Sequence, residues 1–144
     1  MGCVQPSAMK YLFDSNLCIA IMNGNAWRAT AAFDRAIHAG SEFFLPTIVV
    51  HELWFGVAKS SQALANTQKL EGFQRSLTGM LDFSDDDARL SGQIRAELAR
   101  RGTPIGPYDV LIAGQALARG MTLVTENTRE FSRVDGLKLV DWTQ

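Results

Sequence analysis

Short apolar runs alternate with longer segments of helical pattern along this chain. The runs read KYLF at 10–13, FFL at 43–45, GMLDF at 79–83, TLVT at 122–125 and LKLVDW at 137–142. Each run has the length and apolar content of a buried strand. Because no tight hairpin signal separates them, the pattern favours a parallel sheet covered on both faces. We therefore predict one α/β domain with a central parallel sheet of four to five strands flanked by helices.

Helices are expected in the segments between these strands. They cover 15–22, 26–38, 48–58, 61–77, 84–102 and 108–119. Thr47 and Ser61 are the expected N-caps of the third and fourth helices. Ser84, followed by the three carboxylates of 85–87, marks the start of the fifth. We expect the carboxylates of 85–87, Glu126 and Glu130 to be solvated.

Composition narrows the class of protein further. The chain has 144 residues with 14 basic and 15 acidic side chains, so its net charge is −1 and any binding of nucleic acid must be local. No apolar run approaches the roughly 18 residues that span a bilayer, and a cytoplasmic location is expected.

The first eight residues, MGCVQPSA, are expected to be an unstructured leader before a single domain over 9–144. Cys18 lies in an apolar run and is expected to be a buried free thiol.

Polar residues at the predicted strand ends are the candidates for chemistry, because open α/β sheets bind ligands at the carboxyl ends of their strands. Asp14 directly follows the first strand, and Asn127 lies just after the fourth. Asp109 falls in the first turn of an apolar helix, and Glu52 interrupts the apolar segment VVHELWFGV. Asp14 and Asp109 could equally be cap or turn residues. Glu52 is harder to explain in that way, because burying an unpaired carboxylate is costly.

Other catalytic motifs are missing from the sequence. His51 and Glu52 begin a zinc-protease motif, but Phe55 stands where its second histidine would be. There is no nucleophile elbow, phosphate loop or dinucleotide fingerprint. With no nucleophile–base pair evident, clustered carboxylates favour a hard divalent cation such as Mg²⁺ or Mn²⁺.

Four segments stand in a recognisable order, and they are LFDSN at 12–16, VVHELWFGV at 49–57, GTPIGPYDVLIAGQAL at 102–117 and LVTENTREF at 123–131. Together with GLKLVDW at 136–142, they closely resemble PIN-domain ribonucleases, and more narrowly the VapC toxins of bacterial type II toxin–antitoxin pairs. The resemblance extends from Met9 to Trp142. It implies a PIN-like three-layer fold, a homodimer, and an acidic pocket for one or two divalent ions.

The resemblance also assigns roles to the candidate residues. Asp14, Glu52 and Asp109 match the three acids of the family, and Asn127 stands where a fourth Asp or Asn is found. Asp14 and Asp109 are expected to hold the Mg²⁺ or Mn²⁺ ion, and Glu52 to share that ion or act as a general base. Asn127 is expected to orient a water or a ligand.

For the substrate, the resemblance implies cleavage of a structured RNA, in many relatives a tRNA anticodon stem-loop, and neutralisation by a small VapB-type antitoxin. The candidates for contact with RNA are Asn16, Tyr108, Arg95 and Arg129. Tyr108 stands where the family often has Asn, and its ring, like those of Trp54 and Phe55, is suited to stacking on a splayed base. Trp54 and Phe55 are expected mainly in the core or a dimer interface.

Two alternatives remain open on the sequence alone. One is a catalytically inert interaction module that keeps the fold and only binds a partner. The other is a phospho-receiver domain, which would need a second acid beside Asp14 and a lysine after the fifth strand. The chain instead has Ser15 and Asn16 beside Asp14, and Lys138 lies inside the last strand.

Overall fold

Five parallel strands form one sheet in a computed structural model that describes residues 8–144. The strands are β1 (Lys10–Phe13), β2 (Glu42–Pro46), β3 (Gly79–Leu81), β4 (Thr122–Val124) and β5 (Leu139–Val140). Their order in the sheet is β3-β2-β1-β4-β5, with β1 at the centre and paired to both β2 and β4. This confirms the predicted parallel sheet. The expected leader is outside the described residues except for Ala8.

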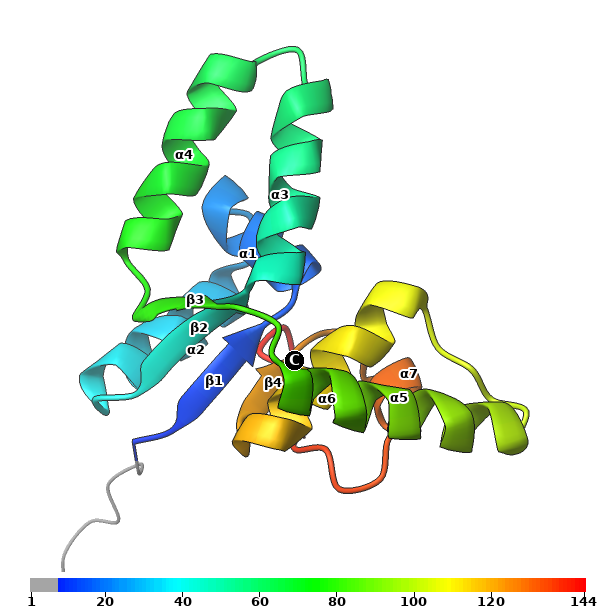
Figure 1. Ribbon diagram of the computed structural model, residues 1–144. Coiled ribbons are helices and arrows are strands. Elements are labelled where there is room, and N and C mark those ends of the chain that lie inside the picture. Colours follow the sequence, from blue (N-terminus) through cyan, green and yellow to red (C-terminus); the bar gives the residue numbers. More distant parts are fainter. Residues whose placement is uncertain (1–7) are drawn as a thin grey trace, which may run out of the picture.

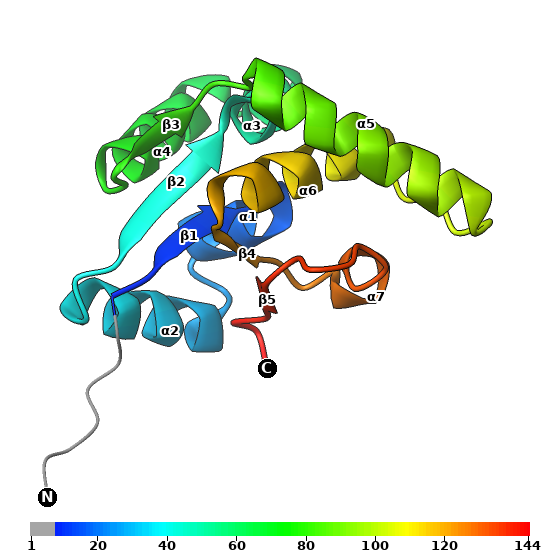
Figure 2. The same ribbon diagram turned by 60° about the horizontal axis from the view of Figure 1, so that its bottom comes forward.

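Helices cover both faces of the sheet. They are α1 (Ser15–Asn23), α2 (Trp27–His38), α3 (Thr47–Lys59), α4 (Ala63–Arg75), α5 (Asp85–Arg100), α6 (Pro107–Arg119) and α7 (Thr128–Phe131). Figure 1 shows α3 and α4 side by side, extending away from α5 and α6. In Figure 2, α5 and α6 lie over one face of the sheet and α2 lies under the other, as a three-layer fold requires. None of the helices in residues 8–144 has the length and apolarity needed to cross a membrane.

Several predicted element ends and caps are corrected by the structure. Helix α3 begins at Thr47 itself, because Pro46 with ψ 139° is the last extended residue and no side chain caps the helix. Helix α4 begins after Gln62, so Ser61 is not its N-cap. Strands β3 and β5 are shorter than predicted. The four-residue helix α7 was not predicted, since one turn is too short to show a helical period.

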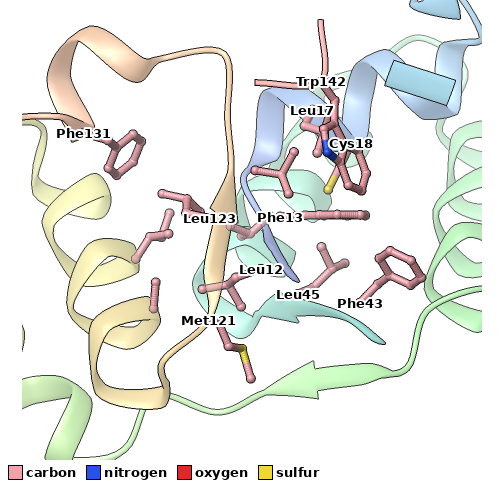
Figure 3. Close-up of a cluster of buried hydrophobic side chains, with 14 of the residues drawn as sticks. Leu12, Phe13, Leu17, Cys18, Phe43, Leu45, Met121, Leu123, Phe131 and Trp142 are labelled. Atoms are coloured by element: carbon pink, nitrogen blue, oxygen red, sulfur yellow. The ribbon is translucent and has the colours of Figure 1, made fainter. Parts of the chain in front are cut away.

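Aromatic side chains dominate the core on the face that carries α2 (Figure 3). Phe33 of α2 contacts Phe43 of β2 at a ring-centroid distance of 4.8 Å and Phe13 of β1 at 5.6 Å. Trp142 closes the cluster against Phe13 at 5.4 Å. Cys18 is fully buried beside these rings, as predicted. This packing fixes the end of β1, the strand that leads directly into Asp14.

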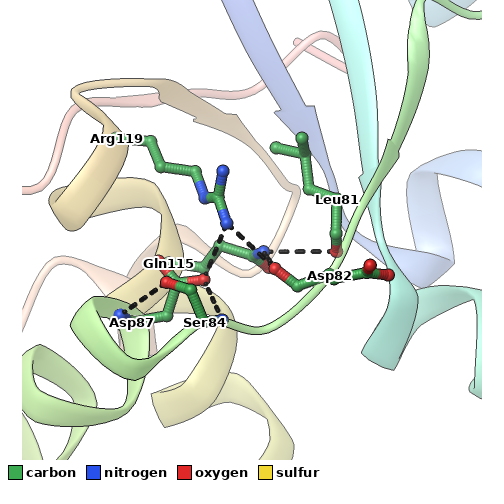
Figure 4. Close-up of polar contacts among 6 residues, drawn as sticks. All are labelled: Leu81, Asp82, Ser84, Asp87, Gln115 and Arg119. Atoms are coloured by element: carbon green, nitrogen blue, oxygen red, sulfur yellow. Dashed lines mark hydrogen bonds and ion pairs between the residues drawn. The ribbon is translucent and has the colours of Figure 1, made fainter.

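A buried polar cluster holds α5 and α6 against the end of β3 (Figure 4). Asp87 is only 1% exposed, so the prediction that it is solvated is wrong. Its Oδ2 accepts hydrogen bonds from the Ser84 backbone N–H (2.8 Å), in a capping box, and from the Arg119 guanidinium (3.0 Å). Arg119 and the amide of Gln115 also donate to the backbone carbonyl of Asp82. Because α6 carries Asp109, these bonds fix the orientation of a candidate site helix.

Helices α5 and α6 also approach each other very closely. A Cβ atom on Gly114 would lie 2.6 Å from the Cβ of Ser91 and 2.7 Å from its backbone N and Cα. No side chain fits there without moving a helix, so glycine is required at this crossing.

Candidate active site

Asp14 lies at the carboxyl end of the central strand and is 6% exposed. Its Oδ1 accepts a hydrogen bond from the Leu17 backbone N–H (3.0 Å), which makes Asp14 the N-cap of α1. Its Oδ2 accepts a short hydrogen bond from the hydroxyl of Thr125, the residue after β4. Asp14 is therefore a helix cap, one of the two roles left open by the sequence, and both of its oxygens are held in place.

Asp109 and Glu52 approach Asp14 from two further helices. Asp109 lies in the first turn of α6, and Glu52 lies in the middle of α3; both are half-buried. The turn before α6 is tight, since a Cβ on Gly106 would lie 3.2 Å from Asp109 Oδ2. The three carboxylates are close enough for the charges of Asp14 and Asp109 to act on Glu52 and that of Asp109 to act on Asp14. The fold thus brings together three of the four predicted site residues.

Burial and nearby negative charges raise the pKa of each of these acids. Burial is the largest cause for Asp14, whose pKa rises to about 6; the charges of Asp109 and Glu126 add to it, and the hydrogen bonds from Thr125 and Leu17 oppose it. Burial also raises the pKa of Asp109, and the charge of Glu130 adds to that rise.

The pKa of Glu52 rises for the same reasons. Burial contributes most, followed by the charges of Asp109 and Asp14. His51 and the Ser15 side chain act in the opposite direction and lower this pKa. Glu52 therefore holds a proton more readily than an exposed glutamate does.

Within residues 8–144, none of the three carboxylates forms an ion pair with a basic side chain. In the same part of the chain, no three His, Cys, Asp or Glu side chains stand as a ready-made set of metal ligands. The cluster is therefore open and its charge uncompensated. Hard carboxylate oxygens without a basic partner are the donor chemistry that suits a divalent cation such as Mg²⁺.

Asn127 is connected to the cluster indirectly. Its backbone N–H donates to the hydroxyl of Thr125 (3.0 Å), and its side-chain amide donates to Glu130 Oε2 (3.3 Å). Glu126 is exposed as predicted, and Glu130 is half-buried, so its side chain keeps part of the predicted contact with solvent. A chain of hydrogen bonds thus runs from the Asn127 backbone through Thr125 to Asp14.

Thr125 is the site residue that the sequence interpretation missed. It is 1% exposed and lies directly after β4, in the position that Asp14 occupies after β1. Polar residues directly after a strand were the candidates for chemistry, so Thr125 would have qualified. Instead, Thr125 was predicted to lie inside the TLVT strand.

The candidates for contact with substrate are all exposed. Asn16 lies in the first turn of α1, Tyr108 precedes Asp109, and Arg95 and Arg129 lie on α5 and α7. Trp54 and Phe55 are 36% and 61% exposed, so they do not lie in the core, and their place in a dimer interface stays a prediction.

A partly open hollow of about 210 Å³ begins at Glu52 and continues between α1, α3 and α4. Its lining is mainly apolar and includes Ile19, Met22, Leu53, Val57 and Leu70, with Asn23, Glu52, Asn66 and Lys69 as polar members. The candidate site therefore adjoins a surface suited to an apolar segment of another chain.

Replacing Thr125 with Val should impair the site without unfolding the protein. The valine keeps the shape of the side chain but cannot donate to Asp14, so the pKa of Asp14 should rise further and its carboxylate should lose its fixed orientation. We expect about a tenfold loss of any activity that depends on Asp14. Thr125→Ser, which keeps the hydroxyl, should retain most of it. Equal activity of the Val and Ser variants would show that the hydrogen bond to Asp14 has no role.

The chain matches the PIN domain family over residues 11–137. The tRNA(fMet)-specific endonuclease VapC of Shigella flexneri is 39% identical over 94% of this chain and 99% of that protein. Its counterpart in Salmonella typhimurium is 40% identical over 93% of this chain and 98% of that protein.

Among solved structures, VapBC2 from Rickettsia felis bound to a DNA fragment from its promoter superposes with a TM-score of 0.86. That match has 34% identity and covers 93% of this chain and 99% of the other. Matches of this length and identity leave one conclusion about family. The chain belongs to the PIN domain family and, within that family, to the VapC proteins.

Proposed function

We propose that this protein is a VapC-type ribonuclease toxin that hydrolyses phosphodiester bonds in a structured RNA, a tRNA, in the cytoplasm. The observation that carries the proposal is the group of three carboxylates with raised pKa at the centre of a PIN fold, where no basic side chain of residues 8–144 pairs with them. The similarity to tRNA(fMet)-specific endonucleases supports the choice of a tRNA. Membership of the PIN family makes the phospho-receiver alternative wrong.

We further propose that the reaction depends on Mg²⁺ or Mn²⁺. Asp14, Asp109 and Glu52 supply the oxygen ligands that such an ion prefers. A bound divalent ion supplies positive charge against the phosphodiester and lowers the pKa of a water molecule. Positive charge at this position would also offset the like charges that add to the raised pKa of each carboxylate.

The other side chains of the site have separate roles in positioning and proton transfer. Thr125 holds Asp14 in one orientation through its hydrogen bond to Oδ2. Glu52 combines a raised pKa with partial exposure, which suits it to accept the proton of the attacking water. Asn127 orients Thr125 through its backbone N–H and holds Glu130 near Asp109.

A VapB-type antitoxin is the proposed partner. The VapBC structures from Rickettsia felis and Salmonella typhimurium are complexes of this kind. The apolar hollow between α1, α3 and α4 begins at Glu52, so a segment bound there would reach the carboxylates. An arginine on that segment would be attracted to the uncompensated charge for the same reason as a metal ion.

A homodimer is also proposed. The side chains of Phe55 and Leu64 on the α3–α4 pair are 61% and 76% exposed, and a second copy packed on this pair would cover them. Sedimentation of the purified protein should give the mass of two chains, and a monomer at micromolar concentration would contradict the proposal.

Brief expression in bacterial cells tests the function directly. Expression of the parent should stop growth, and sequencing of RNA 5′ ends should show new ends concentrated in one tRNA or a few tRNAs. Co-expression of the small open reading frame adjacent to the gene should relieve the arrest. Unimpaired growth with no new RNA ends would instead favour the inert interaction module.

A further inference from the structure

Two aromatic side chains from different helices meet beside the carboxylates. His51 of α3 and Tyr108 of α6 have ring centroids 6.0 Å apart and an interplanar angle of 80°, an edge-to-face contact. Each ring belongs to the residue before a site acid, since His51 precedes Glu52 and Tyr108 precedes Asp109. The pair therefore bridges the two helices at the edge of the candidate active site.

Both rings are accessible to solvent. Tyr108 is 46% exposed and His51 is exposed, unlike the aromatic rings of the core cluster. In an edge-to-face contact the edge of one ring covers one face of the other, so the opposite face of that ring and both faces of its neighbour stay available. The pair thus presents aromatic surface to solvent next to Glu52 and Asp109. A phosphodiester cleaved by these carboxylates would have to lie beside the same surface.

We propose that the His51–Tyr108 pair is a platform on which one unpaired base stacks, next to the phosphodiester that is cleaved. The inference rests on the proposed ribonuclease function and specifies its substrate as RNA with an unstacked nucleotide at the cleavage point. A base inside a duplex is already stacked on its neighbours and cannot lie flat on a side chain, whereas a splayed loop base can. Stacking of this kind is sequence-tolerant, so it selects for RNA structure more than for base identity.

A base fits the pair better than the antitoxin does. The apolar hollow proposed for the antitoxin is lined from α1, α3 and α4, and neither His51 nor Tyr108 lines it. The pair instead joins α3 to α6 at the two residues that precede Glu52 and Asp109. A protein segment in the hollow and a base on the platform would therefore occupy neighbouring but different surfaces.

The test compares variants in steady-state cleavage of purified tRNA with Mn²⁺ present. Tyr108→Leu removes the π-surface and should lower kcat/KM roughly tenfold, mainly by raising KM. Tyr108→Phe keeps the ring and should restore most of that loss. If the two rings act as one platform, adding His51→Leu to Tyr108→Leu should cause little further loss. Trp27→Leu serves as the matched control, because Trp27 is 72% exposed on α2, across the sheet from α6.

A second measurement separates stacking from a structural effect. In the Asp109→Asn background, which we expect to bind RNA without cutting it, a 2-aminopurine base placed beside the mapped cleavage point should lose fluorescence on binding. Tyr108→Leu should abolish most of that quenching, and the same probe in a duplex RNA should show none.

Three outcomes would overturn the platform. Parental kcat/KM and parental quenching in Tyr108→Leu would do so while leaving the proposed ribonuclease function intact. Unchanged cleavage together with weakened antitoxin binding would assign the pair to the protein partner. A parent that cuts no RNA with Mn²⁺ would refute the ribonuclease function and the platform together.

Discussion

Asp14→Asn should lower RNA cleavage by at least about a thousandfold, which corresponds to roughly 4 kcal/mol of transition-state stabilisation. The change removes the charge of the most deeply buried carboxylate of the cluster and weakens any divalent ion held there. The fold should survive, because the Asn side-chain oxygen can still accept the Leu17 N–H bond that caps α1.

The matched control is Asp34→Asn, the same change at an exposed position on α2. It should cleave RNA at the parental rate, and circular dichroism should not distinguish either variant from the parent. Cleavage by Asp14→Asn within tenfold of the parent would mean that the carboxylate group is not the catalytic centre.

Metal-free protein should lose stability as pH rises from about 5 to about 7.5, by roughly 1 kcal/mol from Asp14 alone. The folded-state pKa of Asp14 is about 6, above the ordinary value of 3.8 that applies to the unfolded chain. A raised folded pKa contributes stability that is fully present below the unfolded value and is lost as pH rises through the folded one. Burial and like charges raise the pKa of Glu52 and Asp109 as well, so they act in the same direction.

Urea unfolding in EDTA at the two pH values measures this loss. The pH dependence should be much weaker in Asp14→Asn, which carries no titrating group at that position. A parent whose unfolding free energy is the same at both pH values would mean that the acids are not electrostatically strained.

Addition of Mn²⁺ at neutral pH should offset the repulsion among the site carboxylates and so stabilise the folded protein. An ion at about 100 times its dissociation constant stabilises a folded protein by about 2.7 kcal/mol. In EDTA, Asp109→Asn should melt at a temperature equal to or above that of the parent, because one repelling charge is gone. With Mn²⁺ the order should reverse, since the variant lacks a ligand. If Asp109→Asn were clearly less stable in EDTA and Mn²⁺ had no effect on the parent, Asp109 would be a structural cap.

The fold was predictable because its strands are short apolar runs separated by helices with clear starts and stops. The KYLF run became β1, and the capping box at Ser84 starts α5 as expected. The predicted ends of helices and strands were wrong where a single residue determines the end of an element. Pro46 extends β2 up to the start of α3, so Thr47 became a helical residue and not a cap.

The site was only partly predictable, for a physical reason. Asp14 and Glu52 were found because a charged residue at a strand end or in an apolar helix conflicts with its surroundings. Thr125 carries no charge, and its hydrogen-bond partner Asp14 lies 111 positions away along the chain. The local sequence around Asp87 is that of a solvent-exposed helix cap. In the folded chain Asp87 is paired with Arg119, 32 positions further along. Residues so far apart in the sequence come into contact only through tertiary packing. The local pattern of residue types therefore does not indicate such contacts.

Cleavage of purified tRNA by the purified protein is the most direct test of whether these carboxylates form the active site of a metal-dependent ribonuclease. With Mn²⁺, the parent should convert one tRNA or a few tRNAs into two discrete fragments each. Excess EDTA should stop the reaction, and renewed Mn²⁺ should restart it. Asp14→Asn should yield no fragments under any of these conditions. Intact tRNA after incubation of the parent with Mn²⁺, or the same fragments in EDTA, would contradict the assignment.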